Sequence, residues 1–120
     1  MNIPHEFIGK WRITHMEVWS QDSVDLMVDG YFEFFADDQG QFAFCAVEGD
    51  MDIVLNTRMP ELEFSWEGTD DIDHVSGRGK IEFETPFEGE GIIFIHNGDS
   101  STFSIKRMEV VAPDNVVALR

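Results

Sequence analysis

Residues 61–68 read Glu-Leu-Glu-Phe-Ser-Trp-Glu-Gly, with an apolar side chain at every second position between polar ones. Successive side chains of a β-strand point to opposite faces, so this alternation predicts a strand with Leu62, Phe64 and Trp66 on a buried face. Similar alternation, or short apolar runs rich in strand-forming residues, recurs along most of the chain, and hardly any segment has a helical period. The sequence therefore predicts an all-β protein.

Eight strands are expected, joined by short connections as in a meander. Residues 37–40, 48–50, 59–60 and 97–99 supply the Gly, Pro, Asn and Asp that tight turns require. Only residues 22–28 are expected to form a brief helical turn. The expected strands are residues 10–19, 30–36, 41–48, 51–58, 61–68, 77–84, 89–96 and 101–110.

The two ends of this meander carry a tryptophan and a basic pair. The first strand begins with Gly9-Lys10-Trp11, and Lys106-Arg107 lies near the end of the last. Between Phe7 and Arg107 this arrangement resembles the lipocalin and fatty-acid-binding (calycin) superfamily, in which the tryptophan plugs the closed end of a barrel and a basic side chain packs across it. The resemblance implies an eight-stranded antiparallel up-and-down barrel as a single domain over residues 1–110. Residues 111–120 are then a C-terminal tail, either a disordered end or a docking strand.

Alternation also assigns each strand residue to the inside or the outside of a closed barrel. We expect the polar alternates Glu33, Glu61, Glu63, Glu82 and Glu84 to face water. The many aromatic rings favour a mostly filled interior, with any cavity small and near the mouth. The expected inward set is Phe32, Phe34, Phe42, Phe44, Leu62, Phe64, Trp66, Ile81, Phe83, Phe103 and Ile105.

The up-and-down order gathers residues 20–29, a turn at Gly49, a loop at 69–76 and a turn at 97–100 at the end opposite Trp11. Long loops are therefore expected at this end, where barrels of the resembled family open to ligand. We expect the ligand-binding residues to converge on this mouth: His15, Glu17, Trp19, Tyr31, Trp66, Glu67, Arg78 and His96.

The register of the first strand decides part of this site. If Trp11 points inward, regular alternation turns His15 and Glu17 to the inner face near the rim. A bulge near Thr14 would instead turn Met16 and Val18 inward, since bulges are common at barrel rims. A buried Glu17 would also need a partner, so a purely structural polar cluster with Arg78 or His15 is an equal alternative to a ligand site.

Charge and cysteine content limit the classes of partner. The chain carries 24 acidic and 8 basic residues, a net charge of −16, which repels nucleic acid and anionic membrane surfaces. The single cysteine, Cys45, forms no internal disulfide and fits a reducing compartment, and no secretory leader or membrane span is visible. We expect a cytoplasmic protein that binds neither nucleic acid nor membranes.

Residues 64–79 form the densest motif, and this stretch looks similar to one in small, uncharacterised bacterial proteins with Ser-Trp-Glu-Gly followed by Ser-Gly-Arg-Gly. Asp70, Asp71 and Asp73 within it lack the glycine and terminal glutamate of an EF-hand loop, so we interpret them as a solvated acidic loop. The histidines His15, His74 and His96 have no short metal-ligand spacing. We expect neither a metal nor a cofactor.

Two functions remain, and catalysis is the less favoured class because no nucleophile elbow, phosphate loop or dinucleotide fingerprint occurs. The first is a small-molecule-binding barrel that takes a small apolar or aromatic ligand at its open mouth. The alternative is an acidic protein-interaction module with a filled barrel, a monomer or homodimer, whose apolar residues 116–119 meet a partner.

Overall fold

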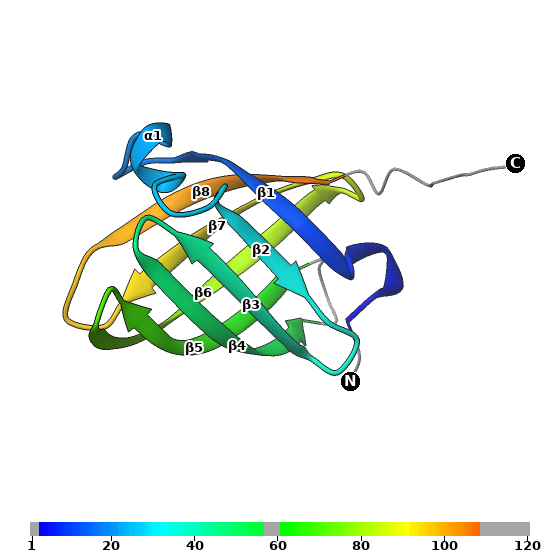
Figure 1. Ribbon diagram of the computed structural model, residues 1–120. Helices are drawn as coiled ribbons and strands as arrows, with labels where there is room; N and C mark the ends of the chain where they lie inside the picture. The colour runs from blue at the N-terminus through cyan, green and yellow to red at the C-terminus, as the bar shows by residue number, and fades with distance from the viewer. Residues whose placement is uncertain (1–2, 57–60, 109–120) are drawn as a thin grey trace, which may run out of the picture.

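The computed structural model describes residues 3–56 and 61–108, and its main element is one closed antiparallel barrel (Figure 1). Each strand pairs with the next in sequence, and β8 pairs with β1, so the predicted all-β, eight-stranded up-and-down barrel is confirmed. Within the described residues, no helix has the length and apolar character needed to cross a membrane. The elements in chain order are η1 (His5–Phe7), β1 (Gly9–Met16), α1 (Gln21–Val24), β2 (Tyr31–Phe34), β3 (Gln39–Phe44), β4 (Val47–Asn56), β5 (Glu61–Asp70), β6 (Asp73–Thr85), β7 (Glu88–Ile95) and β8 (Ser100–Arg107).

The core is the inner face of this barrel. Every residue of the expected inward set is buried, so alternation assigned these faces correctly. Glu61 is the exception among the polar alternates, because it is only 7% exposed although we expected it to face water. It is the first residue of β5 and is paired by register with Asn56 on β4 and Glu82 on β6.

The connection between β3 and β4 differs from the prediction. The chain turns at Cys45 and Ala46, where Cys45 has a φ of 53°, and not at Gly49. Gly49 lies inside β4, opposite Phe42 of β3. The glycine indicated a turn by its residue type, but the close packing of the Phe42 ring against Gly49 is a feature of the assembled sheet.

The predicted loop at 69–76 is also a tight turn. β5 and β6 remain paired as far as Asp70 and Asp73, and Asp71, with a φ of 58°, reverses the chain. Only one long connection, residues 17–30, lies at the end of the described barrel opposite Trp11. The turns expected around Asp38 and Asn97 are present, whereas those at 59–60 and the tail at 111–120 lie outside the described residues.

A β-bulge interrupts β1 between Ile13 and His15, as one of the two alternatives for this strand predicted. Met16 consequently points inward and is 1% exposed, while His15 and Glu17 are exposed on the outside. The expectation that these two residues lie on the inner face is therefore wrong. Val18 is 45% exposed, because β1 ends at Met16 and the chain leaves the barrel wall there.

Residues 17–30 cover part of the barrel end that lies opposite Trp11 (Figure 1). Ser20 caps α1 by accepting a hydrogen bond from the Ser23 amide, and Val24 of α1 is fully buried. The carbonyl of Val24 accepts a hydrogen bond of 2.9 Å from the Cys45 amide, which joins α1 to the β3–β4 turn. The ring of Trp19 lies 5.3 Å from that of Phe44. Side chains of this segment thus pack against the core at this end of the barrel.

The opposite end is closed by Trp11. Its indole Nε1 donates to the carbonyl of Phe7, and the Arg107 guanidinium lies 5.7 Å from the centre of its ring. Arg107 also donates hydrogen bonds to the carbonyls of Glu6 and Ile8, which ties β8 to η1 and its flank. The contact between the basic side chain of the last strand and the tryptophan of the first is therefore present.

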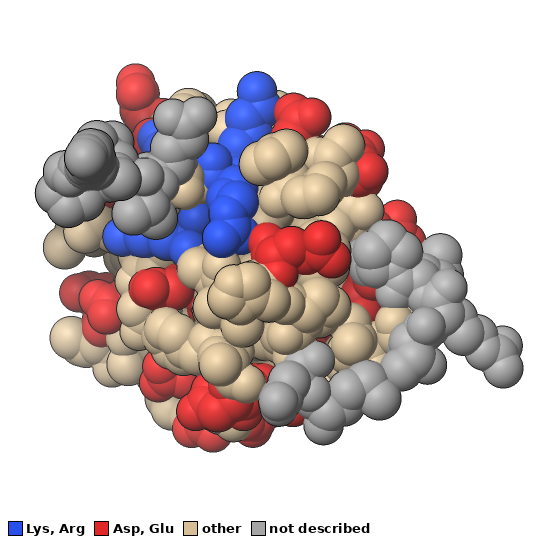
Figure 2. Space-filling view, turned by 90° about the vertical axis from the view of Figure 1, so that its right-hand side faces the viewer, with Lys and Arg blue, Asp and Glu red and all other residues tan. Residues whose placement is uncertain are grey.

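Figure 2 faces this end and shows Lys and Arg side chains gathered together, with Asp and Glu around them. Four basic residues lie on the neighbouring strands β1 and β8, whose register pairs Arg12 with Lys106 and Trp11 with Arg107. These four are Lys10, Arg12, Lys106 and Arg107. Lys10 lies over the ring of Tyr31 at 4.3 Å, and Lys106 pairs with Glu88 at 3.7 Å. Half of the chain's 8 basic residues thus have structural partners on one side of an acidic molecule.

Candidate functional site

The barrel interior holds packed aromatic rings where a lipid carrier would need a cavity. The Phe32 ring centre lies 4.6 Å from that of Phe103 and 5.3 Å from that of Phe42, and the Phe42 ring meets Trp66 edge-on at 5.0 Å. Rings at these separations leave no room for a ligand between them. The pockets that the described residues form and that we consider below lie on the outside of the barrel wall.

The structure does not bring the eight expected site residues together at one mouth. Trp66 is a core residue whose Nε1 donates to the carbonyl of Phe94 at 3.3 Å, and Trp19 packs on the core from the rim. Glu67 lies outside, 3.7 Å from His74. The remaining five are also dispersed: Tyr31 lines one outer pocket, Arg78 and His96 line another, and His15 and Glu17 line neither of the two.

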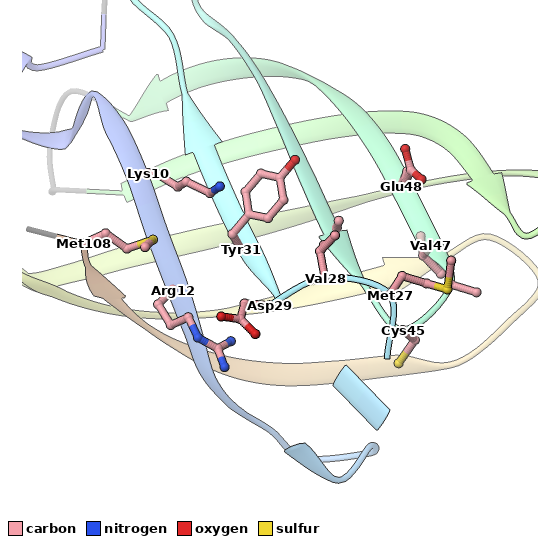
Figure 3. Close-up of a pocket in the computed structure, with 12 residues that line it drawn as sticks. Lys10, Arg12, Met27, Val28, Asp29, Tyr31, Cys45, Val47, Glu48 and Met108 are labelled. Carbon is pink, nitrogen blue, oxygen red and sulfur yellow. The ribbon is translucent and has the colours of Figure 1, made fainter. Parts of the chain in front are cut away.

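The first outer pocket lies between β1–β4 and residues 27–29, and we call it the overhang pocket (Figure 3). Its volume is about 410 Å³, within the range of small-molecule sites. Residues of β1 to β4 form its floor, and residues 27–29 form one wall. Its lining residues are Lys10, Arg12, Met27, Val28, Asp29, Tyr31, Ala43, Cys45, Ala46, Val47, Glu48 and Met108.

The charged groups of the overhang pocket differ in whether they are already paired with another charge. Arg12 is held by Asp25, whose Oδ1 and Oδ2 accept hydrogen bonds of 2.8 and 2.7 Å. Lys10 lies beside the Tyr31 ring, and the carboxylate of Asp29 faces Arg12 (Figure 3). Among the described residues Lys10 forms no ion pair, so its ammonium group is the cation available to a ligand.

The phenol of Tyr31 is a neutral group in this pocket. Burial raises its pKa above the ordinary 10.0, and the nearby carboxylates of Glu33, Glu48 and Asp50 raise it further. The hydroxyl therefore keeps its proton near neutral pH and both donates and accepts hydrogen bonds.

Of the residues that line this pocket, the sequence had assigned only Tyr31 to a site, and Cys45 is one of those that it missed. Its apolar neighbours indicated an inert thiol within a strand, but it lies in the β3–β4 turn and lines the pocket. Burial raises the pKa of its thiol, and the charge of Asp70 raises it further. Cys45 is thus a poor nucleophile near neutral pH, and no signal in the sequence marked the turn.

The second outer pocket, the Arg78 groove, lies over β5, β6 and β7 and has a volume of about 680 Å³. Register places Ser65, Arg78 and Phe94 in one row across these strands. The Arg78 guanidinium lies over the Phe94 ring at 4.4 Å, and the His96 amide donates to the Ser76 carbonyl at 2.8 Å. The lining residues are Ser65, Ser76, Gly77, Arg78, Phe94, Ile95, His96 and Asn97.

Within residues 3–56 and 61–108, no group of three or more His, Cys, Asp or Glu side chains is arranged to hold a metal ion. Asp70, Asp71 and Asp73 are exposed around the β5–β6 turn, and His74 lies beside Glu67. Neither outer pocket contains a nucleophile paired with a general base. Comparison of the chain with protein-family models, with curated proteins and with solved structures found no match.

Proposed function

We propose that this protein is a non-enzymatic binding barrel that takes a small, largely apolar or aromatic ligand in the overhang pocket. The observation that carries the proposal is a 410 Å³ pocket with an apolar floor and a few charged groups at its edge, outside a barrel whose interior is filled. Ligand sites combine these features, because apolar walls supply affinity and a few polar groups fix orientation. The site thus lies on the outer wall and not at the mouth.

The lining indicates the chemistry of the ligand. Met27, Val28, Ala43 and Met108 offer apolar and polarizable surface. The Lys10 ammonium, which has no carboxylate partner among the described residues, would meet a carbonyl or acidic group of the ligand. The ligand we propose has an apolar body and one such polar end.

Native mass spectrometry of freshly purified protein tests this proposal. The intact mass is compared with the mass after denaturation, and a discrete difference identifies a retained ligand. The Ala43→Trp variant fills the pocket from its floor, while Thr102→Trp adds the same ring to the exposed outer face of β8 and is the matched control. We expect the extra mass to be lost in Ala43→Trp and kept in Thr102→Trp.

If the purified protein carries no ligand, titrations with indole and with anilinonaphthalene sulfonate followed by two-dimensional NMR take its place. Saturable shifts of the amides of residues 26–31 and 43–48 support the proposal, with affinity at least about tenfold weaker in Ala43→Trp. Absence of saturable shifts there, or equal binding by both variants, contradicts it.

A second candidate, the interaction module, is favoured by the exposure of one wall of the pocket. Leu26, Met27 and Val28 are 64, 71 and 50% exposed, and three consecutive exposed apolar side chains are typical of a protein contact. This candidate predicts that the protein is recovered as a homodimer or complex, and that Leu26→Ser with Met27→Ser disrupts it. Light scattering of the two proteins at equal concentration distinguishes it from small-molecule binding, which leaves a monomer.

The Trp11–Arg107 contact supports a relationship to the calycin barrels, because that superfamily closes one end of its barrel in this way. We propose this relationship together with a cytoplasmic location, which the single cysteine and the acidic composition favour.

A further inference from the structure

The Arg78 groove differs in charge from the rest of this acidic chain. Acidic residues outnumber basic ones by 24 to 8, yet no carboxylate belongs to the lining of this groove. Its polar side chains are the guanidinium of Arg78, the imidazole of His96, the amide of Asn97 and the hydroxyls of Ser65 and Ser76. All five groups can donate hydrogen bonds, so the groove presents donors on a surface where acceptors dominate.

Arg78 is held in place without being neutralised. Its guanidinium lies 4.4 Å from the centre of the Phe94 ring, which supports one face of the group. Arg78 also lines a neighbouring hollow that contains Glu61 and Glu63, so carboxylates lie on one side of the groove and not within its lining. Within the described part of the chain, Arg78 forms no ion pair. Glu67 lies opposite Ser76 by register, but it is next to His74 at 3.7 Å and does not line the groove.

The neighbouring elements fix the remaining donors around Arg78. Ser65 lies opposite Arg78 on β5, and the hydrogen bond from the His96 amide to the Ser76 carbonyl places the start of the β7–β8 turn beside β6. Asn97 follows in that turn with a φ of 62°. Donors thus come from β5, β6 and the turn after β7, around a groove of about 680 Å³.

From this convergence we infer that the Arg78 groove is a binding site for a small oxyanion, carried as a carboxylate or a phosphate. Guanidinium groups bind the oxygens of both anions with paired hydrogen bonds, and hydroxyl, amide and imidazole donors complete such sites. The site lies on β5–β7 and is separate from the overhang pocket on β1–β4, so the inference does not depend on the proposed function.

The experiment is an NMR titration of the full chain with inorganic phosphate and, separately, with benzoate. Ionic strength is kept constant with sodium chloride at a level where charges more than about 10 Å apart are screened. We expect saturable shifts at the Arg78 side-chain Nε–H and at the amides of Ser76 and His96. Saturation by both probes assigns the groove to oxyanions in general, whereas saturation by one identifies the preferred carrier.

Lys80 provides a matched control. It lies two positions along β6 from Arg78, on the same outer face, and also forms no ion pair within the described residues. It shares the neighbouring hollow with Arg78 but does not line the groove. We expect Arg78→Gln to weaken binding at least about tenfold and Lys80→Gln to change it less than about twofold. Equal effects of the two substitutions, shifts that do not saturate, or the same shifts with chloride alone would overturn the inference.

Discussion

The guanidinium of Arg12 on β1 holds the carboxylate of Asp25 through two hydrogen bonds, 2.8 Å to Oδ1 and 2.7 Å to Oδ2. The same carboxylate accepts a hydrogen bond of 2.8 Å from the Gly30 amide and one of 3.1 Å from the Gln21 side chain. These bonds fasten residues 17–30 to the barrel, and this segment includes one wall of the overhang pocket. The pocket therefore depends on an ion pair that lies at its edge.

Replacing Asp25 with Asn is expected to lower the free energy of unfolding near neutral pH by about 1 to 2 kcal/mol, after allowance for its partial exposure. Hydrogen bonds from Arg12 lower the pKa of Asp25 from 3.8 to about 2, so the stabilisation is complete above the unfolded value and is lost as pH falls through 2. Urea unfolding at several pH values measures this. Asp29→Asn is the control, and the same pH dependence in wild type and Asp25→Asn between pH 4 and 2 would contradict the prediction.

Arg107→Ala is expected to destabilise the barrel by about 1 to 3 kcal/mol, because it removes the contact with Trp11 and two hydrogen bonds to backbone carbonyls. Lys106→Ala removes an equal charge from the next position, where the side chain is exposed, and should cost less than about 0.5 kcal/mol. Urea unfolding of both variants checks the difference. Equal losses would show that charge, and not the contact with Trp11, accounts for the effect.

Gly77→Ala is expected to destabilise the protein by several kcal/mol or to prevent folding. A Cβ at this position would lie 1.8 Å from the Phe94 carbonyl oxygen and 2.8 Å from the Trp66 indole nitrogen, and backbone atoms on β7 cannot move away without breaking the sheet. Gly98→Ala, in the β7–β8 turn, meets no atom closer than 3.1 Å and is the control. Thermal unfolding of the two variants should separate them widely, and near-equal melting temperatures would contradict the packing.

The bulge in β1 predicts opposite effects at neighbouring positions. Met16→Ala should cost about 2 to 5 kcal/mol because it empties a buried site, while His15→Ala should be close to neutral because that side chain is exposed. Chemical denaturation of the two variants measures this contrast. The reverse order of stabilities would mean that β1 alternates regularly and turns His15 inward.

Cys45 is expected to react with iodoacetamide more slowly in the folded protein than in the urea-unfolded chain, by about threefold or more near neutral pH. Burial and the charge of Asp70 raise the pKa of its thiol, so less thiolate is present until the pH rises. Mass spectrometry of the alkylated protein gives both rates. Because Cys45 lines the overhang pocket, an occupying ligand should slow the reaction further, and equal rates in the folded and unfolded states would contradict the burial.

Alternation assigned every residue of the expected inward set to the correct face, because the period of a strand is a local property of the chain. Phe32, Phe64 and Phe103 could be assigned to the interior from their neighbours in sequence alone, and their number predicted that the barrel would be filled. The contact of Trp11 with Arg107 was also foreseeable, through the resemblance and not through any spacing.

The tertiary structure alone decided where the β3–β4 and β5–β6 turns lie and which polar residues share a pocket. Gly49 suggested a turn by its residue type, but β3 and β4 remain paired as far as Phe44 and Val47, so the chain turns at Cys45. As a result Cys45 is part of the lining of the overhang pocket. Arg78 and His96 line the same groove because β6 and β7 pair in a register that sets Arg78 beside Phe94. Alternation and composition are local properties of the chain, whereas pairing register and the positions of bulges depend on contacts between distant segments. For this reason the sequence predicted the barrel, and only the structure showed where its outer pockets lie.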